Sequence, residues 1–232
     1  MSSYCANDDV LSSNGGVLIA FKDELIDSAM FGSERALTTR ISELLPLTKL
    51  AIDRQAQRDF DYHEEETVTL DGEGNSDTLF LGASLGYKPI LAVTSITEND
   101  LVLEDTTYQV RGTEGEITKV CADTYTSGGA WKRGYHNIAI VMTWGYETSS
   151  CSGTYTTDVP PEIIQAQAKL TAAAILAQSA GAGSGGVKSM SIGAFSVSYG
   201  EGHGYAPAIN SWAEDIRAAC RYYGRGIRLI GA

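Results

Sequence analysis

The residues of this sequence that could do chemistry are its three histidines, His63, His136 and His203, together with Cys121. Residues 62–66 read Tyr-His-Glu-Glu-Glu, but no second histidine follows one helical turn later, as a zinc site on a helix would need. His203 lies in a glycine-rich segment that lacks the Gly-Lys-Ser/Thr ending of a phosphate-binding loop. Cys121 could pair with His136 or His203, although no nucleophile signature surrounds it. We therefore expect no catalytic residues, no metal site and no cofactor.

The charge of the chain is unevenly distributed. The formal net charge is −12, and residues 61–120 contain 13 acidic side chains but only Lys88, Arg111 and Lys119 as basic ones. By contrast, residues 217–232 contain four arginines and no acidic residue. A protein whose main task is to coat nucleic acid needs lysine and arginine for the phosphates, so this composition argues against such a role. The acidic middle and the basic end suggest two different neighbours.

The segment 225–232 is apolar and basic at once, and it is the strongest candidate for binding a partner. Its candidate binding side chains are Arg225, Ile227, Arg228, Leu229 and Ile230. Arginines make charge-assisted hydrogen bonds, and the apolar side chains add area that a free surface should not display. We therefore expect residues 225–232 to be a docking tail for a neighbouring protein.

The cysteines and apolar runs give no indication of export or membrane insertion. The four cysteines are scattered and form no Cys-x-x-Cys pair, which is typical of unpaired thiols in a reducing compartment. The start of the chain lacks the basic and apolar regions of a signal peptide, and no apolar run approaches the ~20 residues of a membrane-spanning helix. We therefore expect no membrane partner.

Helical periodicity is found toward both ends of the chain. Residues 1–16 are small and polar, and we expect an N-terminal arm with little structure of its own. In residues 17–66 apolar side chains recur at helical spacing, although Pro46 predicts a kink or two abutting helices. Residues 148–224 form a second helical part with a β excursion, in which the strand parity changes at Gly193. The two helical parts are expected to pack together as a bundle.

Between the helical parts, the apolar period changes from that of a helix to that of a strand. Turn-rich segments separate short alternating runs across 67–147. The candidate strands are 67–70, 78–81, 90–97, 108–111, 117–121 and 137–146. We therefore predict an α+β fold, in which a small antiparallel β domain over 67–147 is inserted into a helical bundle formed by the N- and C-terminal segments.

One helix of the second helical part is unusually rich in alanine. We expect it over 162–180, after Pro160 and Pro161 turn the chain into its first turn. Alanine has little side-chain bulk, so a neighbouring backbone can approach such a helix closely. The candidate residues for a contact between subunits are Ala166, Ala173, Ala177 and Trp212.

Several short motifs occur in a characteristic order along the chain. Arg58-Asp59-Phe60 closes the first helical part, and Asp71-Gly72-Glu73-Gly74 separates the first two candidate strands. A strand ending in Trp144-Gly145-Tyr146 is followed by the helix start Val159-Pro160-Pro161-Glu162. In content and order, these motifs resemble the head–tail connector (adaptor) proteins of tailed bacteriophages, and the resemblance covers most of residues 17–223.

The resemblance implies a virion structural protein without catalytic residues. Members of the family form homo-oligomeric rings, commonly dodecamers, that lie beneath the portal protein and join it to a tail or stopper protein. DNA would pass through the ring without specific binding. The ring would lie in the neck of the virion after assembly in the host cytoplasm, and the portal is then the expected partner of the docking tail.

The alternative is a non-catalytic carbohydrate- or protein-binding β module with helical support. Such a module presents exposed aromatic side chains on a sheet face, and Tyr108, Tyr125, Trp131 and Tyr135 could serve. Size-exclusion chromatography separates the two hypotheses, because a large ring-like species favours the connector and a monomer favours the module.

Overall fold

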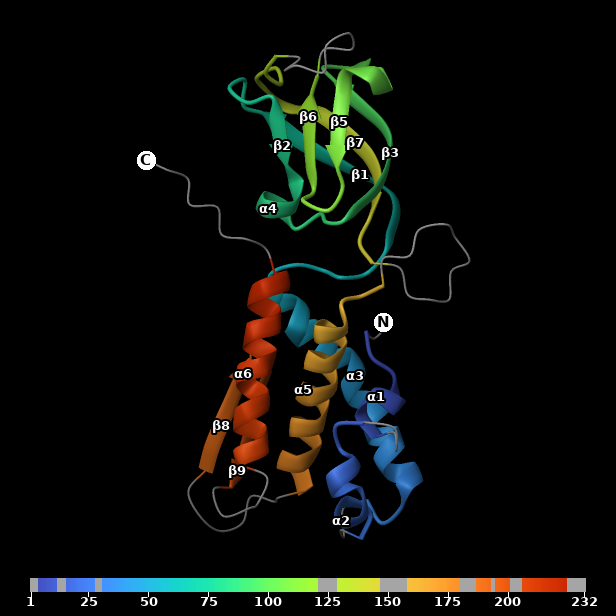
Figure 1. The fold of residues 1–232 in the computed structure, drawn as a ribbon, viewed down its shortest axis with the longest axis vertical. Coiled ribbons are helices and arrows are strands. Elements are labelled where there is room, and N and C mark those ends of the chain that lie inside the picture. The colour runs from blue at the N-terminus through green and yellow to red at the C-terminus, as the bar shows by residue number, and fades with distance from the viewer. Residues whose placement is uncertain are drawn as a thin grey trace. The chain divides into compact units, whose positions relative to one another are not determined.

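The computed structural model describes residues 4–11, 16–27, 31–120, 129–146, 158–179, 187–192, 195–200 and 206–224. The chain divides into a helical unit, from Met1–Gln57 and Val159–Gly224, and a β unit within Arg58–Asp158. The predicted α+β fold is confirmed, because helices from both ends of the chain form the first unit and antiparallel sheets form the second (Figure 1). The β unit extends beyond the predicted 67–147 at both ends.

Helix α3 (Glu34–Ala56) supplies a long apolar stripe to the helical unit. It begins after Ser33, whose side-chain oxygen accepts a hydrogen bond from the backbone N–H of Ala36 and so caps the helix. Pro46 lies inside this single helix, so two abutting helices are not formed. The buried side chains follow the predicted spacing and include Leu37, Ile41, Leu44, Leu45, Thr48, Ala51 and Ile52.

Helices α5 (Pro161–Ser179) and α6 (Ala206–Tyr223) pack against each other and against α3. Figure 1 shows the three helices running side by side. Gly224 follows the end of α6, as predicted, and a Cβ added there would lie 2.7 Å from the carbonyl oxygen of Ala56. Small residues therefore allow close approach inside this unit.

The first residues of the chain also pack into the helical unit. Helix α1 (Asn7–Leu11) contacts α3 and α5. The backbone N–H groups of Tyr4 and Cys5 both donate hydrogen bonds to Oε1 of Gln167 on α5, at 2.9 and 3.0 Å. Gln167 is fully buried, and a buried amide needs such partners. For the residues that the structure describes, the expectation that 1–16 form an arm with little structure is therefore wrong.

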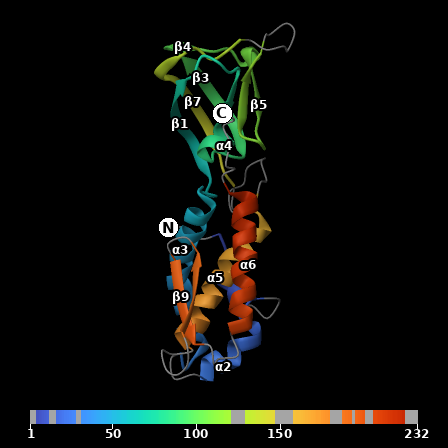
Figure 2. The ribbon, with the colours of Figure 1, turned by 90° about the vertical axis from the view of Figure 1, so that its left-hand side faces the viewer.

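A short helix and a β-hairpin complete the described part of the helical unit. Helix α2 (Lys22–Asp27) follows the 3₁₀ turn η1 (Ile19–Phe21). Strands β8 (Val187–Ile192) and β9 (Phe195–Gly200) pair antiparallel, and β8 contacts α6 while β9 contacts α5. Figure 2 shows this hairpin alongside the helices. The predicted change of strand parity therefore falls between the two strands of a hairpin.

Two antiparallel sheets form the β unit, with the strand orders β1-β7-β3-β4 and β2-β6-β5. The strands are β1 (His63–Gly72), β2 (Thr78–Phe80), β3 (Ile90–Glu98), β4 (Leu101–Val102), β5 (Tyr108–Arg111), β6 (Glu116–Lys119) and β7 (Gly134–Trp144). The short helix α4 (Leu81–Leu85) and the 3₁₀ turn η2 (Asp105–Thr107) were not predicted. All the predicted strands between 67 and 147 are present; the strand predicted at 108–111 has the ends of β5, and the other strands have different ends.

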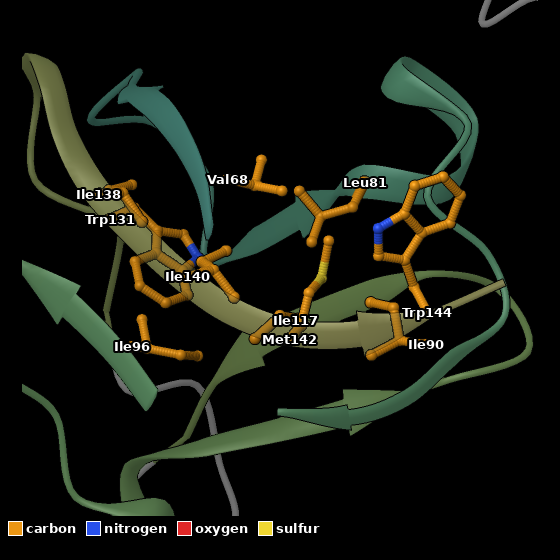
Figure 3. Close-up of a cluster of buried hydrophobic side chains, with 10 residues drawn as sticks. All are labelled: Val68, Leu81, Ile90, Ile96, Ile117, Trp131, Ile138, Ile140, Met142 and Trp144. Carbon is orange, nitrogen blue, oxygen red and sulfur yellow. The ribbon is translucent and has the colours of Figure 1, made fainter. Parts of the chain in front are cut away.

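The core of the β unit is a cluster of apolar side chains from both sheets (Figure 3). Its members are Val68, Leu81, Ile90, Ile96, Ile117, Trp131, Ile138, Ile140, Met142 and Trp144. The last four are alternate residues of β7, as the sequence parity predicted. The backbone N–H of Ile90 donates to the carbonyl oxygen of Gly112 at 2.8 Å, which ties β3 to the end of β5. The sheets are therefore joined beside β3 and β5, and β1 and β2 are edge strands.

Candidate functional site

The β unit has a cavity between its edge strands β1 and β2. The cavity has a volume of about 440 Å³, and both strands contribute to its lining. Its apolar lining residues are Leu70, Leu79, Phe80, Leu81, Leu85 and Trp131. Asp71 and Glu73 also line it, and both are exposed, so the cavity combines an apolar wall with acidic side chains. This combination suits a ligand that is apolar and cationic at once.

Trp131 lines this cavity, and its buried indole N–H is a hydrogen-bond donor without a partner. Its side chain is 1 % exposed, and its indole Nε1 has no hydrogen-bond partner. Figure 3 shows the indole inside the core cluster, beside Ile140. A buried indole N–H normally finds an acceptor, so this donor is an exception that calls for an explanation.

A buried ion pair lies next to Trp131. Lys119 Nζ is 2.7 Å from Glu98 Oε2 and 4.7 Å from the centroid of the Trp131 ring. The backbone N–H of Lys132 donates to Glu98 Oε1 at 2.7 Å. Burial raises the pKa of Glu98, but the hydrogen bonds from Lys119 and Lys132 and their charges outweigh it, so the pKa is lowered. Glu98 therefore holds β6 and the chain around Trp131 in place as a carboxylate.

Of the aromatic side chains expected for a carbohydrate-binding module, Tyr135 is the only exposed one among the described residues. Trp131 faces the core, and Tyr108 is half-buried, with its hydroxyl donating to Asp105 Oδ1 at 2.9 Å. Tyr135 is exposed, and Tyr125 lies outside the described residues. Stacking on a sugar needs exposed ring faces, whereas the ring of Trp131 packs in the core cluster.

His63 lies in a cluster of carboxylates and rings that suits packing. Its Nε2 is 3.3 Å from Asp59 Oδ2, and its ring stacks on Trp144 with centroids 4.1 Å apart. Trp144 Nε1 donates to Glu66 Oε2 at 2.6 Å. Tyr87 meets the edge of Trp144 at 4.8 Å, and the pKa of Tyr87 is raised by burial and by the charge of Glu66. The printed partners of the imidazole are thus two carboxylates and an aromatic ring.

The other predicted chemical groups do not come together in the part of the chain that the structure describes. His136 is exposed on β7, with Nε2 4.0 Å from Asp71 Oδ1, while Cys121 and His203 lie outside the described residues. Within those residues, no group of three or more His, Cys, Asp or Glu side chains is placed to hold a metal ion. No described helix combines the length and apolarity needed to cross a membrane.

A groove of about 610 Å³ runs between α5 and α6 of the helical unit. Lys169 of α5 pairs with Asp215 of α6 at 2.6 Å, and the hydroxyl of Tyr223 donates to Glu162 Oε2 at 2.9 Å. Tyr222 also lines the groove and is 80 % exposed. These polar links across the groove occupy many of the charges that a partner would otherwise meet.

The predicted subunit-contact residues differ in how far their side chains are buried. Ala173 is fully buried because neighbouring elements cover its side of α5, so it offers no surface to a second subunit. Ala166 is also buried but lines the groove between α5 and α6. Ala177 and Trp212 are half-buried. Ala173 is therefore removed from the candidate set.

The predicted docking tail lies outside the described residues. Its candidate side chains are Arg225, Ile227, Arg228, Leu229 and Ile230. Their binding role therefore stays a prediction.

Sequence reasoning missed the ion pair and the cavity. Glu98 lies just beyond the predicted strand 90–97, but it belongs to β3 and has the same parity as the buried Ile90 and Ile96. Lys119 likewise shares the parity of the buried Ile117 on β6. A charged residue at an inward position on each of two strands is a signal for a buried pair. No comparable signal marks the cavity, because it depends on which strands lie at the sheet edges.

Comparison with protein families and with curated proteins identifies no relative. The sequence matches no protein-family model, and it matches no curated protein at a significant level.

Proposed function

We propose that the protein is a virion structural protein, the subunit of a head–tail connector ring of a tailed bacteriophage. The observation that carries the proposal is the inserted architecture together with its junction motif. Strand β7 ends at Trp144 and is followed by Gly145, and α5 then starts at Pro161. This order of a β unit, a Trp-Gly-Tyr end and a Val-Pro-Pro-Glu helix start is the plan that the connector resemblance implies.

The proposal assigns the protein a structural role and no catalysis. The described imidazoles, on His63 and His136, have carboxylates and aromatic rings as partners, which suits packing and surface charge. The ring would join the portal protein above to a tail or stopper protein below, in the neck of the virion. Subunits would be added in the host cytoplasm during assembly of the particle.

The acidic composition supports a channel that lets DNA pass without holding it. Phosphates are repelled by carboxylates, and a surface with few lysines or arginines has no deep binding wells along the path. The exposed acidic residues of the β unit include Glu64, Glu65, Asp71, Glu73, Asp100, Glu104, Asp105 and Glu114. Such a surface would favour movement of DNA over binding.

The purified full chain is therefore expected to have negligible affinity for double-stranded DNA at about 0.15 M salt. The affinity is measured by electrophoretic mobility shift with a labelled duplex of random sequence. The matched variant is Glu64→Lys/Glu65→Lys, in which the added cations should create weak, salt-dependent binding. Tight, salt-sensitive binding by the unmodified chain would count against a passive channel.

A further inference from the structure

We propose that the cavity between β1 and β2 receives residues 225–232 of a second copy of the chain as an added strand. The choice of a second copy rests on the proposed ring, in which each subunit must contact the next. The cavity, the two edge strands and the unpartnered indole of Trp131 are the structural basis.

The edge strands make the cavity suitable for an extended segment. Strand β1 is at the end of the four-stranded sheet, and β2 is at the end of the three-stranded sheet. An edge strand carries backbone N–H and C=O groups on one side that no neighbouring strand uses, and an extended peptide can bind by pairing with them. A compact small molecule would leave these backbone groups unused.

The lining of the cavity offers apolar contacts to the side chains of an inserted strand and a hydrogen-bond donor to one of its backbone carbonyl groups. Leu70 and Leu79 are only partly buried and pack against the core cluster, so they offer apolar area at the opening. The indole N–H of Trp131 has no acceptor among the residues described. The carbonyl oxygen of an inserted strand is an acceptor of the kind that this donor lacks.

The charges of the two parts are complementary. The cavity lining includes Asp71 and Glu73 and contains no lysine or arginine, whereas residues 225–232 contain Arg225 and Arg228 and no acidic residue. In an extended chain alternate side chains lie on the same face, so Ile227 and Leu229 would face the apolar wall together. Arg228 would then lie on the opposite face with Ile230, toward the carboxylates at the surface, while Arg225 would share the face of Ile227.

Exchange of this segment between copies would give a directional contact. The donor surface and the receptor surface belong to different parts of the chain, so each copy gives its segment to one neighbour and receives one from the other. Contacts of this head-to-tail type form closed rings when the rotation between neighbours closes. Each contact can be weak, because a closed ring multiplies weak sites.

Charge exchange in the full-length chain tests the inference. The receptor variant is Asp71→Lys/Glu73→Lys, the donor variant is Arg225→Glu/Arg228→Glu, and the matched control is Glu104→Lys/Glu114→Lys, at two exposed acids outside the cavity lining. We expect the receptor and donor variants each to raise the concentration for half-maximal assembly at least about tenfold, measured by light scattering after size exclusion, and the control to leave it unchanged. Because Asp71 also accepts a hydrogen bond from the backbone N–H of His136, Glu73→Lys alone is included, with circular dichroism to verify folding.

Mixing the receptor and donor variants is the decisive step. In the mixture, the lysines in the cavity of the receptor variant meet the glutamates in the tail of the donor variant, so assembly should return. The variant that carries all four substitutions should assemble alone, even if the ring has an odd number of subunits. Recovery on mixing requires exchange between copies and cannot arise from a segment bound within its own chain. If the unmodified chain assembles and both variants assemble equally well, the inference fails while the ring stands. If the unmodified chain stays monomeric, the ring and the exchange both fail.

Discussion

Lys119→Met is expected to lower the free energy of unfolding of the β unit by about 3–5 kcal/mol at pH 7, because it leaves the carboxylate of Glu98 buried without its cation. Glu98 is 3 % exposed, and its bond to Lys119 is 2.7 Å long. Urea denaturation of the full chain, followed by tryptophan fluorescence, measures the change. The matched control is Lys119→Met combined with Glu98→Gln, which removes the charge that was left unpaired and should recover part of the loss.

The pH dependence gives this prediction a second, independent check. Since the pKa of Glu98 is lowered in the folded chain, the pair stabilises the fold above the ordinary value of 4.5 and loses that effect as pH falls through the folded pKa. In Lys119→Met, burial still raises the pKa of Glu98, whereas the hydrogen bond and charge of Lys119 no longer lower it. The difference in stability between the two chains should therefore shrink below about pH 4. A difference that is constant from pH 7 to pH 3 would contradict the role given to this pair.

Gly145→Ala is expected to destabilise the β unit by about 2–5 kcal/mol through backbone strain and a steric clash. Gly145 has a φ of 96°, and a Cβ there would lie 1.9 Å from the carbonyl oxygen of Asp61. The residue ends the strand motif Trp144-Gly145-Tyr146, so its backbone must pass close to the chain that enters β1. Thermal and urea denaturation of the full-length variant measure the loss.

Gly129→Ala is the matched control for the glycine prediction. Gly129 has a similar φ of 91°, but a Cβ there would meet no atom within 4 Å. Comparison of the two variants separates the cost of the positive φ from the cost of the clash. Equal losses at the two positions would show that the close approach to Asp61 contributes nothing.

The sequence pattern predicted the elements whose burial follows from local periodicity. Ile138, Ile140, Met142 and Trp144 alternate along β7 and are buried as expected. The start of β1 was predicted too late, because residues 63–66 belong to an edge strand and carry charged side chains instead of an apolar alternation. Periodicity thus detects a strand through its buried face and misses the part that faces water.

Other features depend on contacts that are distant in the sequence. Residues 4–11 read as a polar arm, but the buried side chain of Gln167, more than 150 positions away, accepts hydrogen bonds from the backbone of Tyr4 and Cys5. The cavity depends on a strand order in which β1 pairs with β7 and β2 pairs with β6. No local pattern in the sequence predicts that β1 and β2 are edge strands, so the cavity between them could not be predicted from the sequence.

Negative-stain electron microscopy of the purified full-length chain tests the central claim most directly. At neutral pH, about 0.15 M salt and micromolar concentration, the connector proposal predicts closed rings of uniform size with a central channel, in the absence of DNA or any other protein. Native mass spectrometry of the same sample should give a single subunit number. A sample that contains only monomers across this range of concentration would contradict the proposal that the protein is a ring-forming connector subunit.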